Sequence, residues 1–331
     1  MLKLFHWRIK FEKTIVMRVL YPEIAPYQTF FLETGSSHSV YVELNGNPDG
    51  IPVLFLHGGP CSGTKPDHRR FFNPDQYLIV LFDQRGCGQS LPFGEIEHNS
   101  TQDLIDDMER IRCYLSIEKW LVFGGSWGGT LALLYAQQHH DKVLGLIIRG
   151  VFLARQQDMD WFIANGANRI YPEQWQRLAD CVPVQKRDNF VQGLWDEINS
   201  DNETAKAQVA KEWQSWNGQL AMGKAFQPQS QDSIGSEEQV KQVRMELLYA
   251  VNRYFIKENQ VLENCGVLQN IPTTIIHGRY DLVCPMEAAF SLHQALPNAE
   301  YIVLTNAGHV AQHEEMIDTL VCATDRFATS N

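Results

Sequence analysis

One short stretch, V-F-G-G-S-W-G-G-T-L at residues 122–131, constrains the fold of this 331-residue chain more than any other. An apolar, β-forming segment at 120–123 leads into it, and a helix-forming segment at 130–138 follows. In a G-x-S-x-G sequence between a strand and a helix, the serine sits on a strained turn, and the glycines let the helix pack close to the strand. The sequence therefore predicts that Ser126 is an exposed nucleophile. A glycine-rich loop with a bystander serine is the alternative until partners for Ser126 are found.

A serine hydroxyl becomes a good nucleophile only when a base removes its proton, and the base needs an acid to orient it. The apolar segment at 273–277 runs into Asp281, and the segment at 301–304 runs into His309. This order, serine, then acid, then histidine, with each partner after a late strand, is typical of hydrolases with a G-x-S-x-G nucleophile. We therefore predict that Asp281 orients His309, and that His309 acts as the base for Ser126. Taken singly, Asp281 is also typical of a turn and His309 of a helix start.

Acyl transfer also needs two backbone N–H groups that stabilise the oxyanion. One normally belongs to the residue after the nucleophile, here Trp127, and the other to a loop after an early strand. The sequence H-G-G-P-C at 57–61 follows the apolar segment 52–56, and Gly59 is our candidate for the second donor. A tight turn with no catalytic role is the alternative for this loop.

The hydrophobic pattern predicts an α/β fold. Residues 28–44 alternate like a hairpin with one solvated face, with the turn at Gly35 and Ser36, and residues 103–117 have the apolar stripe of a crossover helix. Several other runs are too uniformly apolar for a half-exposed strand and fit a parallel sheet covered on both faces. These runs are 52–56, 77–82, 120–123 and 143–148, and the strand pattern resumes at 273–277 and 301–304 before a final helix.

No convincing strand occurs between residues 152 and 263, where the sequence predicts tryptophan-rich amphipathic helices. An all-helical insertion of this size is best placed as a cap over the strand ends, where ligands bind in open α/β sheets. We therefore predict a core of residues 17–151 and 264–331 with a mostly parallel sheet and helices on both faces, and a cap of residues 152–263. Residues 1–16 are predicted to be a non-core N-terminal extension, with the fold beginning at Met17.

Composition narrows the functional classes. The formal net charge of -11 argues against nucleic acid or an anionic membrane surface as a partner, because both attract a basic face. No apolar run approaches the roughly 20 residues that span a bilayer. The seven cysteines are scattered and form no C-x-x-C pair, which predicts a reduced, cytoplasmic location and no structural zinc. The sequence gives no indication of oligomeric state.

Taken together, the motifs resemble those of the proline iminopeptidases (prolyl aminopeptidases), which are serine peptidases of the α/β-hydrolase fold. The matching segments are H-G-G-P at 57–60, F-D-Q-R-G-C-G-Q-S at 82–90, G-G-S-W-G at 124–128, H-G-R-Y-D at 277–281 and A-T-D-R-F at 323–327. The similarity extends from about residue 21 to 327 and includes the cap. It implies release of N-terminal proline from small peptides without metal or cofactor. It also implies a pocket for the proline ring lined by Phe152, Phe162, Phe255 and Cys284, although the family more often has tyrosine at position 162.

Two departures from the family concern the substrate's amine. The family has a glutamate after a W-x-x-W motif and another before an N-x-Y-F motif, and this chain has Asn217 and Val251 at these substrate-binding positions. A charge-assisted hydrogen bond is worth about 1.5–3 kcal/mol, so each loss corresponds to roughly tenfold to hundredfold in affinity. Glu212, Glu246 and Glu258 are the alternative carboxylates, from a shifted register.

A third departure is Cys61, where the family usually has glycine. If this position needs a positive φ, the cysteine strains the oxyanion loop.

The sequence thus predicts a serine hydrolase that resembles proline iminopeptidase and acts through an acyl-enzyme on Ser126. An esterase or amidase for small uncharged acyl substrates is the main alternative, because the expected carboxylates are replaced. A non-catalytic binding protein that keeps the fold is a third possibility, which a broken triad or elbow would indicate. The motifs of this sequence are intact.

Overall fold

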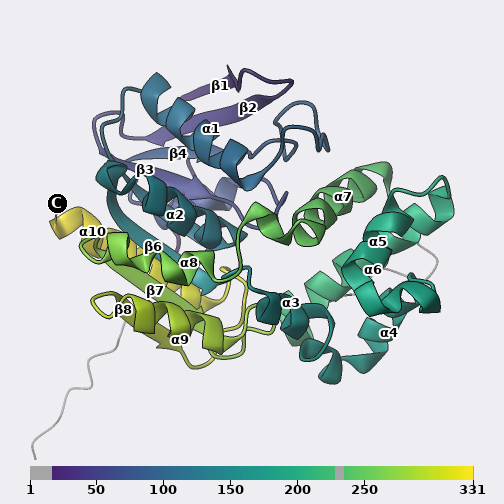
Figure 1. Cartoon of the computed structure of the whole chain (residues 1–331). Coiled ribbons are helices and arrows are strands. Elements are labelled where there is room, and N and C mark those ends of the chain that lie inside the picture. Colours follow the sequence, from purple (N-terminus) through teal and green to yellow (C-terminus); the bar gives the residue numbers. More distant parts are fainter. Residues whose placement is uncertain (1–16, 228–234, 331) are drawn as a thin grey trace, which may run out of the picture.

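The computed structural model describes residues 17–227 and 235–330, and the predicted extension at 1–16 lies outside them. An eight-stranded sheet forms the centre of the larger part of the molecule (Figure 1), with the order β1-β2-β4-β3-β5-β6-β7-β8. The strands are β1 (Gln28–Glu33), β2 (Ser39–Gly46), β3 (Ile51–Leu56), β4 (Tyr77–Phe82), β5 (Trp120–Ser126), β6 (Val143–Val151), β7 (Thr273–Gly278) and β8 (Glu300–Leu304). Strand β2 is antiparallel to both of its neighbours, and all pairs from β4 to β8 are parallel. The predicted mostly parallel sheet is confirmed.

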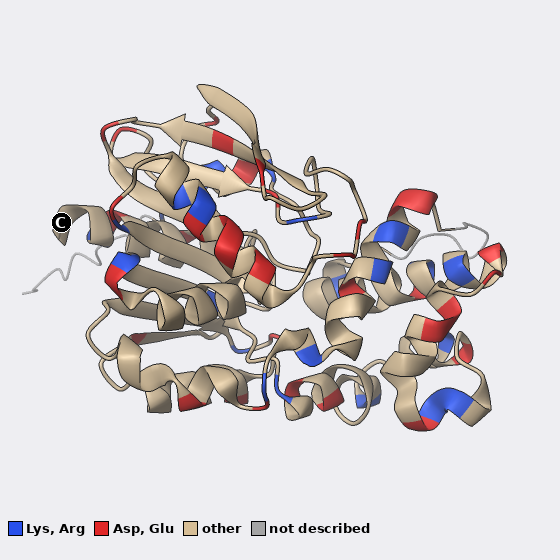
Figure 2. Cartoon of the chain, turned by 45° about the horizontal axis from the view of Figure 1, so that its top comes forward, with Lys and Arg blue, Asp and Glu red and all other residues tan. Residues whose placement is uncertain are grey.

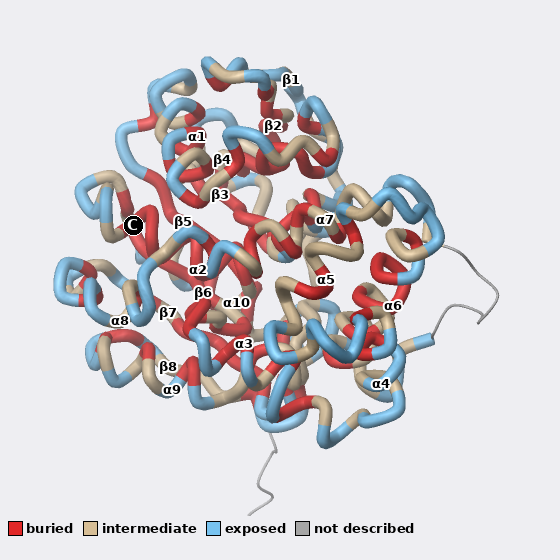
Figure 3. The backbone as a smooth tube through the Cα atoms, turned by 45° about the vertical axis from the view of Figure 1, so that its right-hand side comes forward, coloured by how far each residue is buried: buried red, intermediate tan, exposed pale blue. Residues whose placement is uncertain are grey.

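Helices cover both faces of the sheet, as the uniformly apolar strands predicted. Along β5, Val122 belongs to a buried cluster that includes residues of α1 (Thr101–Tyr114), α2 (Trp127–Gln138) and α9 (Met286–Ala295), whereas Phe123 belongs to a second cluster that includes residues of α10 (Glu314–Ser330). The alternation follows from the two-residue period of a strand. Figure 3 shows the result, with buried strands at the centre and exposed surfaces on the outer helices.

The parallel register brings the functional loops together. Phe55 of β3 pairs with Phe123 of β5, and Leu56 pairs with Gly124. The loop that begins at His57 therefore leaves the sheet beside the G-G-S-W-G turn, at the carboxyl ends of the parallel strands.

Between β6 and β7, the part of the chain that the structure describes contains helices joined by short loops and no strand. Its main helices are α3 (Gln156–Ile163), α4 (Pro172–Asp180), α5 (Phe190–Ile198), α6 (Glu203–Met222) and α7 (Glu237–Val251). Figure 1 shows them grouped beside the sheet rather than on its faces. Their contact surface is aromatic: the indole N–H of Trp216, for example, donates to the carbonyl of Phe162 at 3.0 Å.

The short helix α8 (Gln260–Glu263) packs against the core. It contacts α2 and α9, and the side-chain amide of Gln137 on α2 donates to the carbonyl of Val261 at 2.7 Å. The predicted cap, 152–263, therefore ends with one helix that packs against the core.

Charged residues of both signs are spread over the core helices and the cap (Figure 2). Within residues 17–227 and 235–330, none of the helices combines the length and the apolar character needed to cross a bilayer.

Candidate active site

The candidate nucleophile lies on a strained turn. Ser126 is the last residue of β5, directly before α2, and has φ 56° and ψ -127°. A Cβ added at Gly128 would collide with the carbonyl oxygen of Leu56 and lie 2.8 Å from that of His57. The elbow therefore needs glycine where α2 passes the end of β3, and the predicted strained strand-to-helix turn is confirmed.

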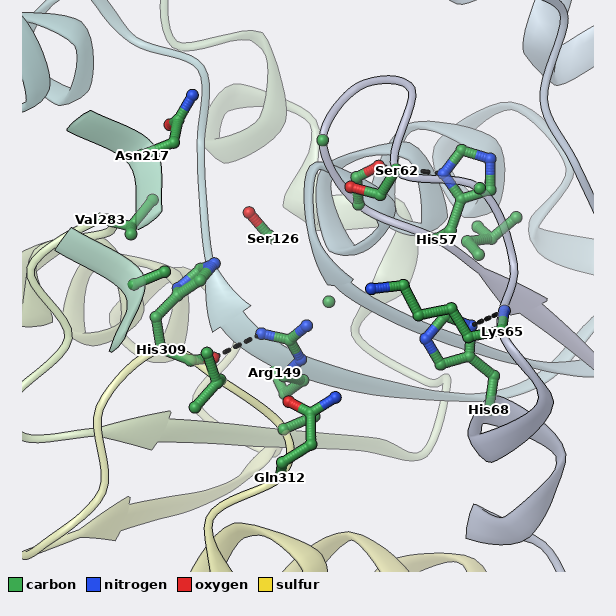
Figure 4. Close-up of a pocket in the computed structure, with 18 of the residues that line it drawn as sticks. His57, Ser62, Lys65, His68, Ser126, Arg149, Asn217, Val283, His309 and Gln312 are labelled. Carbon is green, nitrogen blue, oxygen red and sulfur yellow. Dashed lines mark hydrogen bonds between the residues drawn. The ribbon is translucent and has the colours of Figure 1, made fainter. Parts of the chain in front are cut away.

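The loops after β7 and β8 bring a carboxylate and an imidazole together. His309 Nδ1 donates to Asp281 Oδ2 at 2.7 Å. Since the carboxylate only accepts, the neutral ring carries its proton on Nδ1, and Nε2 is left as the acceptor. Figure 4 shows the ring turned toward Ser126.

The same loop keeps Asp281 ionised. Its Oδ1 accepts hydrogen bonds from the backbone N–H groups of Val283 and Cys284, at 3.0 and 2.8 Å. Burial raises the pKa of Asp281, but His309, His277 and the hydrogen bonds outweigh burial, so the net pKa lies below its usual value. An ionised carboxylate here stabilises the imidazolium that forms when the base takes a proton.

Two further residues at strand ends hold this pair, and the sequence analysis did not assign them. Arg149 Nη1 on β6 donates to the carbonyl of His309 at 2.7 Å. His277 Nδ1 accepts the N–H of Val151 at 3.0 Å, so its Nε2 donates to the carbonyl of Cys284, also at 3.0 Å. A charged arginine in an otherwise apolar strand was the signal available in the sequence.

The H-G-G-P loop lies directly over the elbow. A Cβ added at Gly58 would be 3.5 Å from that of Ser126. Gln84 clamps the loop, since its backbone N–H donates to His57 Nε2 at 3.0 Å and its side-chain amide donates to the His57 carbonyl at 2.9 Å. The indole N–H of Trp127 in turn donates to Gln84 Oε1 at 2.9 Å. The loop with the candidate donor Gly59 is thus tied to the residue after the nucleophile.

Cys61, in the same loop, has φ 75° and is buried. The φ of Cys61 is therefore positive, which is the backbone conformation expected to strain this loop when the residue is not glycine.

Two spaces that share several lining residues adjoin Ser126. The smaller is a mostly apolar cavity of ≈ 50 Å³, and the larger is a groove of ≈ 390 Å³ with both polar and apolar lining. Of the residues predicted to bind substrate, Phe152, Phe162, Cys284 and Asn217 line the cavity. It is also lined by residues that the sequence analysis did not assign to it, namely Met159, Trp213, Tyr254 and Val283.

The structure places Phe255 and Val251 elsewhere, which corrects both predictions. The Phe255 ring is 39% exposed and packs edge-on against Tyr249, with 5.3 Å between ring centroids. Tyr254 points inward instead, 4.9 Å from the ring of Phe152, because the backbone kinks at φ 54° within the turn Arg253–Phe255. Val251 lines a separate groove with Arg253.

A carboxylate lies in the cavity even though Asn217 and Val251 replace the expected ones. Glu246 on α7 lines both spaces beside Ser126. Its Oε2 accepts from the indole N–H of Trp213 at 2.7 Å and from Asn217 Nδ2 at 3.3 Å, and its Oε1 accepts from Gln242 at 3.3 Å. Burial raises the pKa of Glu246 to about 7, although the hydrogen bonds from Trp213 and Gln242 lower it.

The other two alternative carboxylates point elsewhere. Glu212 lines a groove on the cap together with Arg177. Glu258 accepts the backbone N–H of Gln156 at 3.0 Å. Glu246 is therefore the one of the three that shares a cavity with Ser126.

Asp281, Cys284 and His309 place ligand atoms within 4.8 Å of one another. Their hydrogen bonds fit a carboxylate that orients a histidine rather than a metal centre, because Asp281 already accepts from His309 and from two backbone N–H groups. Burial also raises the pKa of the Cys284 thiol well above its usual value, and a thiol must lose its proton to bind metal.

Comparison with known proteins agrees with this geometry. Residues 51–316 match the family model described as alpha/beta hydrolase fold. The chain is 42% identical over 318 residues to the proline iminopeptidase of Arabidopsis thaliana, covering 96% of this chain and 84% of that protein. It is also 42% identical over 316 residues to the proline iminopeptidase of Xylella fastidiosa, covering 94% of this chain and 100% of that protein. A structure from work on carboxylesterases of Nitrososphaera gargenis superposes with a TM-score of 0.62 at 18% identity, covering 91% of this chain and 100% of that chain, and is similar in fold alone.

Proposed function

Because the chain belongs to the proline iminopeptidases, a family of α/β hydrolases, we propose that it releases N-terminal proline from small peptides through an acyl-enzyme on Ser126. One observation carries the proposal: a mostly apolar cavity beside the nucleophile contains a carboxylate, that of Glu246. Phe152, Phe162 and Cys284 suit a pyrrolidine ring. Glu246 suits its cationic amine, and this amine distinguishes an N-terminal proline from a neutral acyl group.

The proposed mechanism uses the neutral tautomer of His309. Ser126 Oγ attacks the prolyl carbonyl carbon while its proton passes to His309 Nε2, and the oxyanion accepts from the N–H groups of Gly59 and Trp127. The C–N bond then breaks, and the imidazolium gives its proton to the leaving amine. Water then attacks the prolyl ester while His309 takes its proton; the bond between the acyl carbon and Ser126 Oγ breaks, free proline leaves, and His309 gives the proton to Ser126 Oγ. Asp281 stays ionised throughout, and this chemistry needs no cofactor.

Two substrates test the proposal: prolyl β-naphthylamide and a p-nitrophenyl ester of a neutral acyl group. We expect turnover of the prolyl substrate, loss of turnover in Ser126→Ala, and labelling of Ser126 by a fluorophosphonate probe. Turnover of the ester alone would contradict the peptidase assignment. Failure of the native protein to label would instead favour a non-catalytic binding protein.

An esterase or amidase for small uncharged acyl groups is the second candidate. The raised pKa of Glu246 favours it, because the cavity carries no charge when this carboxyl is protonated, below about pH 7. A neutral acyl group then meets no desolvated charge. The ratio of prolyl to ester turnover, measured from pH 5 to pH 8, separates the two candidates: it rises with pH only if ionised Glu246 holds the amine.

A cytoplasmic location is also part of the proposal. All seven cysteines lie within the described residues and are free thiols, which a reducing compartment preserves. Fractionation of the native host, followed by immunoblotting, tests this location.

A further inference from the structure

The groove beside Ser126 has oppositely charged ends. Glu246 lies at the cap end, whereas Lys65 and Arg149 line the core end. Figure 4 shows Lys65 extending across the groove toward Ser126, with Arg149 beneath the serine. A peptide acylating Ser126 with its amine at Glu246 would direct its leaving residue toward these two cations.

Arg149 lies very close to the nucleophile. A Cβ added at Gly125, the residue before Ser126, would lie 2.9 Å from Arg149 Nη2. The hydrogen bond to the His309 carbonyl uses Nη1 and leaves Nε and Nη2 as further donors. Burial lowers the pKa of Arg149, but a guanidinium stays protonated in proteins. The α-carboxylate of a dipeptide ends roughly one residue length, about 3.5 Å, beyond the scissile bond, which suits a cation this close to the serine.

His68 adds a neutral donor to the same wall. The backbone N–H of Lys65 donates to His68 Nδ1 at 3.0 Å, so the neutral ring carries its proton on Nε2. Burial, with the charges of Arg149 and Lys65 contributing, lowers the pKa of His68 to about 3, and the ring is therefore neutral. The nearby carboxylate of Asp67 is engaged by Arg70 at 2.8 Å. The core end of the groove thus has two cations and one N–H donor.

We propose that Lys65, His68 and Arg149 form a subsite for the free C-terminal carboxylate of a short leaving group. The inference rests on the proposed prolyl aminopeptidase function and specifies its substrates as prolyl dipeptides and tripeptides with free carboxyl ends. A guanidinium against Gly125 reaches the carboxylate of a dipeptide, and the lysine at the mouth of the groove reaches that of a tripeptide.

The test compares kcat/KM for the tripeptide Pro-Ala-Ala, its C-terminal amide and prolyl β-naphthylamide. We expect the wild-type enzyme to prefer the free acid over the amide by roughly tenfold or more, since charge-assisted hydrogen bonds are worth about this much. Lys65→Met, which keeps the apolar stem and removes the charge, should reduce this preference several-fold and leave the neutral naphthylamide unchanged. Added salt should weaken the preference in the wild type and less in the variant.

Lys119→Met is the matched control, because Lys119 is exposed and directly precedes β5, at the opposite end of that strand from Ser126. Equal turnover of acid and amide by the wild type would overturn the subsite, as would a Lys65→Met variant that keeps the full preference or slows all three substrates equally. If no prolyl substrate is cleaved while a neutral ester is, the proposed function fails instead. Circular dichroism melting verifies that both variants are folded.

Discussion

Replacing Glu246 by glutamine tests two expectations together. The first is that the Glu246 carboxylate binds the substrate's amine, and the second is that burying this carboxylate lowers the free energy of unfolding. The substitution keeps the shape of the side chain and an oxygen that can accept from Trp213, but removes the charge. If Glu246 holds the substrate's amine, prolyl kcat/KM at pH 8 should fall by roughly tenfold to hundredfold, the value of one charge-assisted hydrogen bond. Turnover of a neutral p-nitrophenyl ester should stay within about twofold, because the triad is untouched.

The same substitution should stabilise the protein above neutral pH. Burial raises the pKa of Glu246 from 4.5 to about 7, so the unfolded chain releases this proton first as pH rises. The Glu246 carboxyl therefore leaves the free energy of unfolding undiminished below pH 4.5, and it lowers this free energy progressively as pH rises through 7. At about 1.36 kcal/mol for each pH unit, the loss reaches about 3 kcal/mol. Glutamine cannot ionise, and the variant should avoid this loss.

Urea denaturation of both proteins at pH 5 and pH 8 measures the effect. The difference in unfolding free energy, variant minus wild type, should grow by about 2 kcal/mol between these pH values. Glu212→Gln is the matched control for selectivity, because Glu212 lies on the cap outside the cavity, and it should leave the ratio of prolyl to ester turnover unchanged. A difference that does not change with pH would refute the raised pKa of the buried Glu246 carboxyl. Unchanged prolyl selectivity would refute the proposal that Glu246 holds the substrate's amine.

Three further changes probe the rest of the site. Gly128→Ala should destabilise the fold by about 1–3 kcal/mol, because its Cβ collides with the backbone of β3, whereas Gly266→Ala, with open space around its Cβ, should have little effect in the same thermal melts. Asp281→Asn should lower kcat by roughly 10³- to 10⁴-fold with little change in KM, and normal kinetics would contradict its role in orienting the histidine. Asn217→Glu should raise prolyl kcat/KM at pH 8 and lose this gain at pH 6, because a second carboxylate beside Glu246 holds a proton more tightly; a gain that is equal at both pH values would contradict this coupling.

The core and the candidate triad were predictable because strong local constraints determine both. The apolar run predicted at 77–82 coincides with β4, since a strand buried on both faces must be apolar throughout. Asp281 and His309 follow β7 and β8, which are neighbours in the sheet, and the contact between them results from strand order. In these regions the hydrophobic period and the position along the strand were sufficient.

The cap was less predictable because an amphipathic pattern does not show which polar residue faces a cavity. The sequence shows both Tyr254 and Phe255, but only the backbone kink with its positive φ turns Tyr254 inward and leaves Phe255 exposed. Glu246 lies between the buried residues Met245 and Leu247 of α7, and nothing in that spacing distinguishes it from a surface glutamate. Only the packing of α6 against α7 shows that Glu246 faces the cavity.

That packing explains how the proposed amine site differs from the pattern that the resemblance implies, while the candidate triad keeps that pattern. Each residue of the candidate triad lies at or just after the end of one strand, β5, β7 or β8, so its position is set by the sheet. Asn217 on α6 and Glu246 on α7 instead approach one point from two helices, with 3.3 Å between Nδ2 and Oε2. A carboxylate on either helix reaches the same part of the cavity, and the neutral partner then donates a hydrogen bond to it. The position of the charge, rather than the motif that carries it, is therefore what the proposed substrate requires.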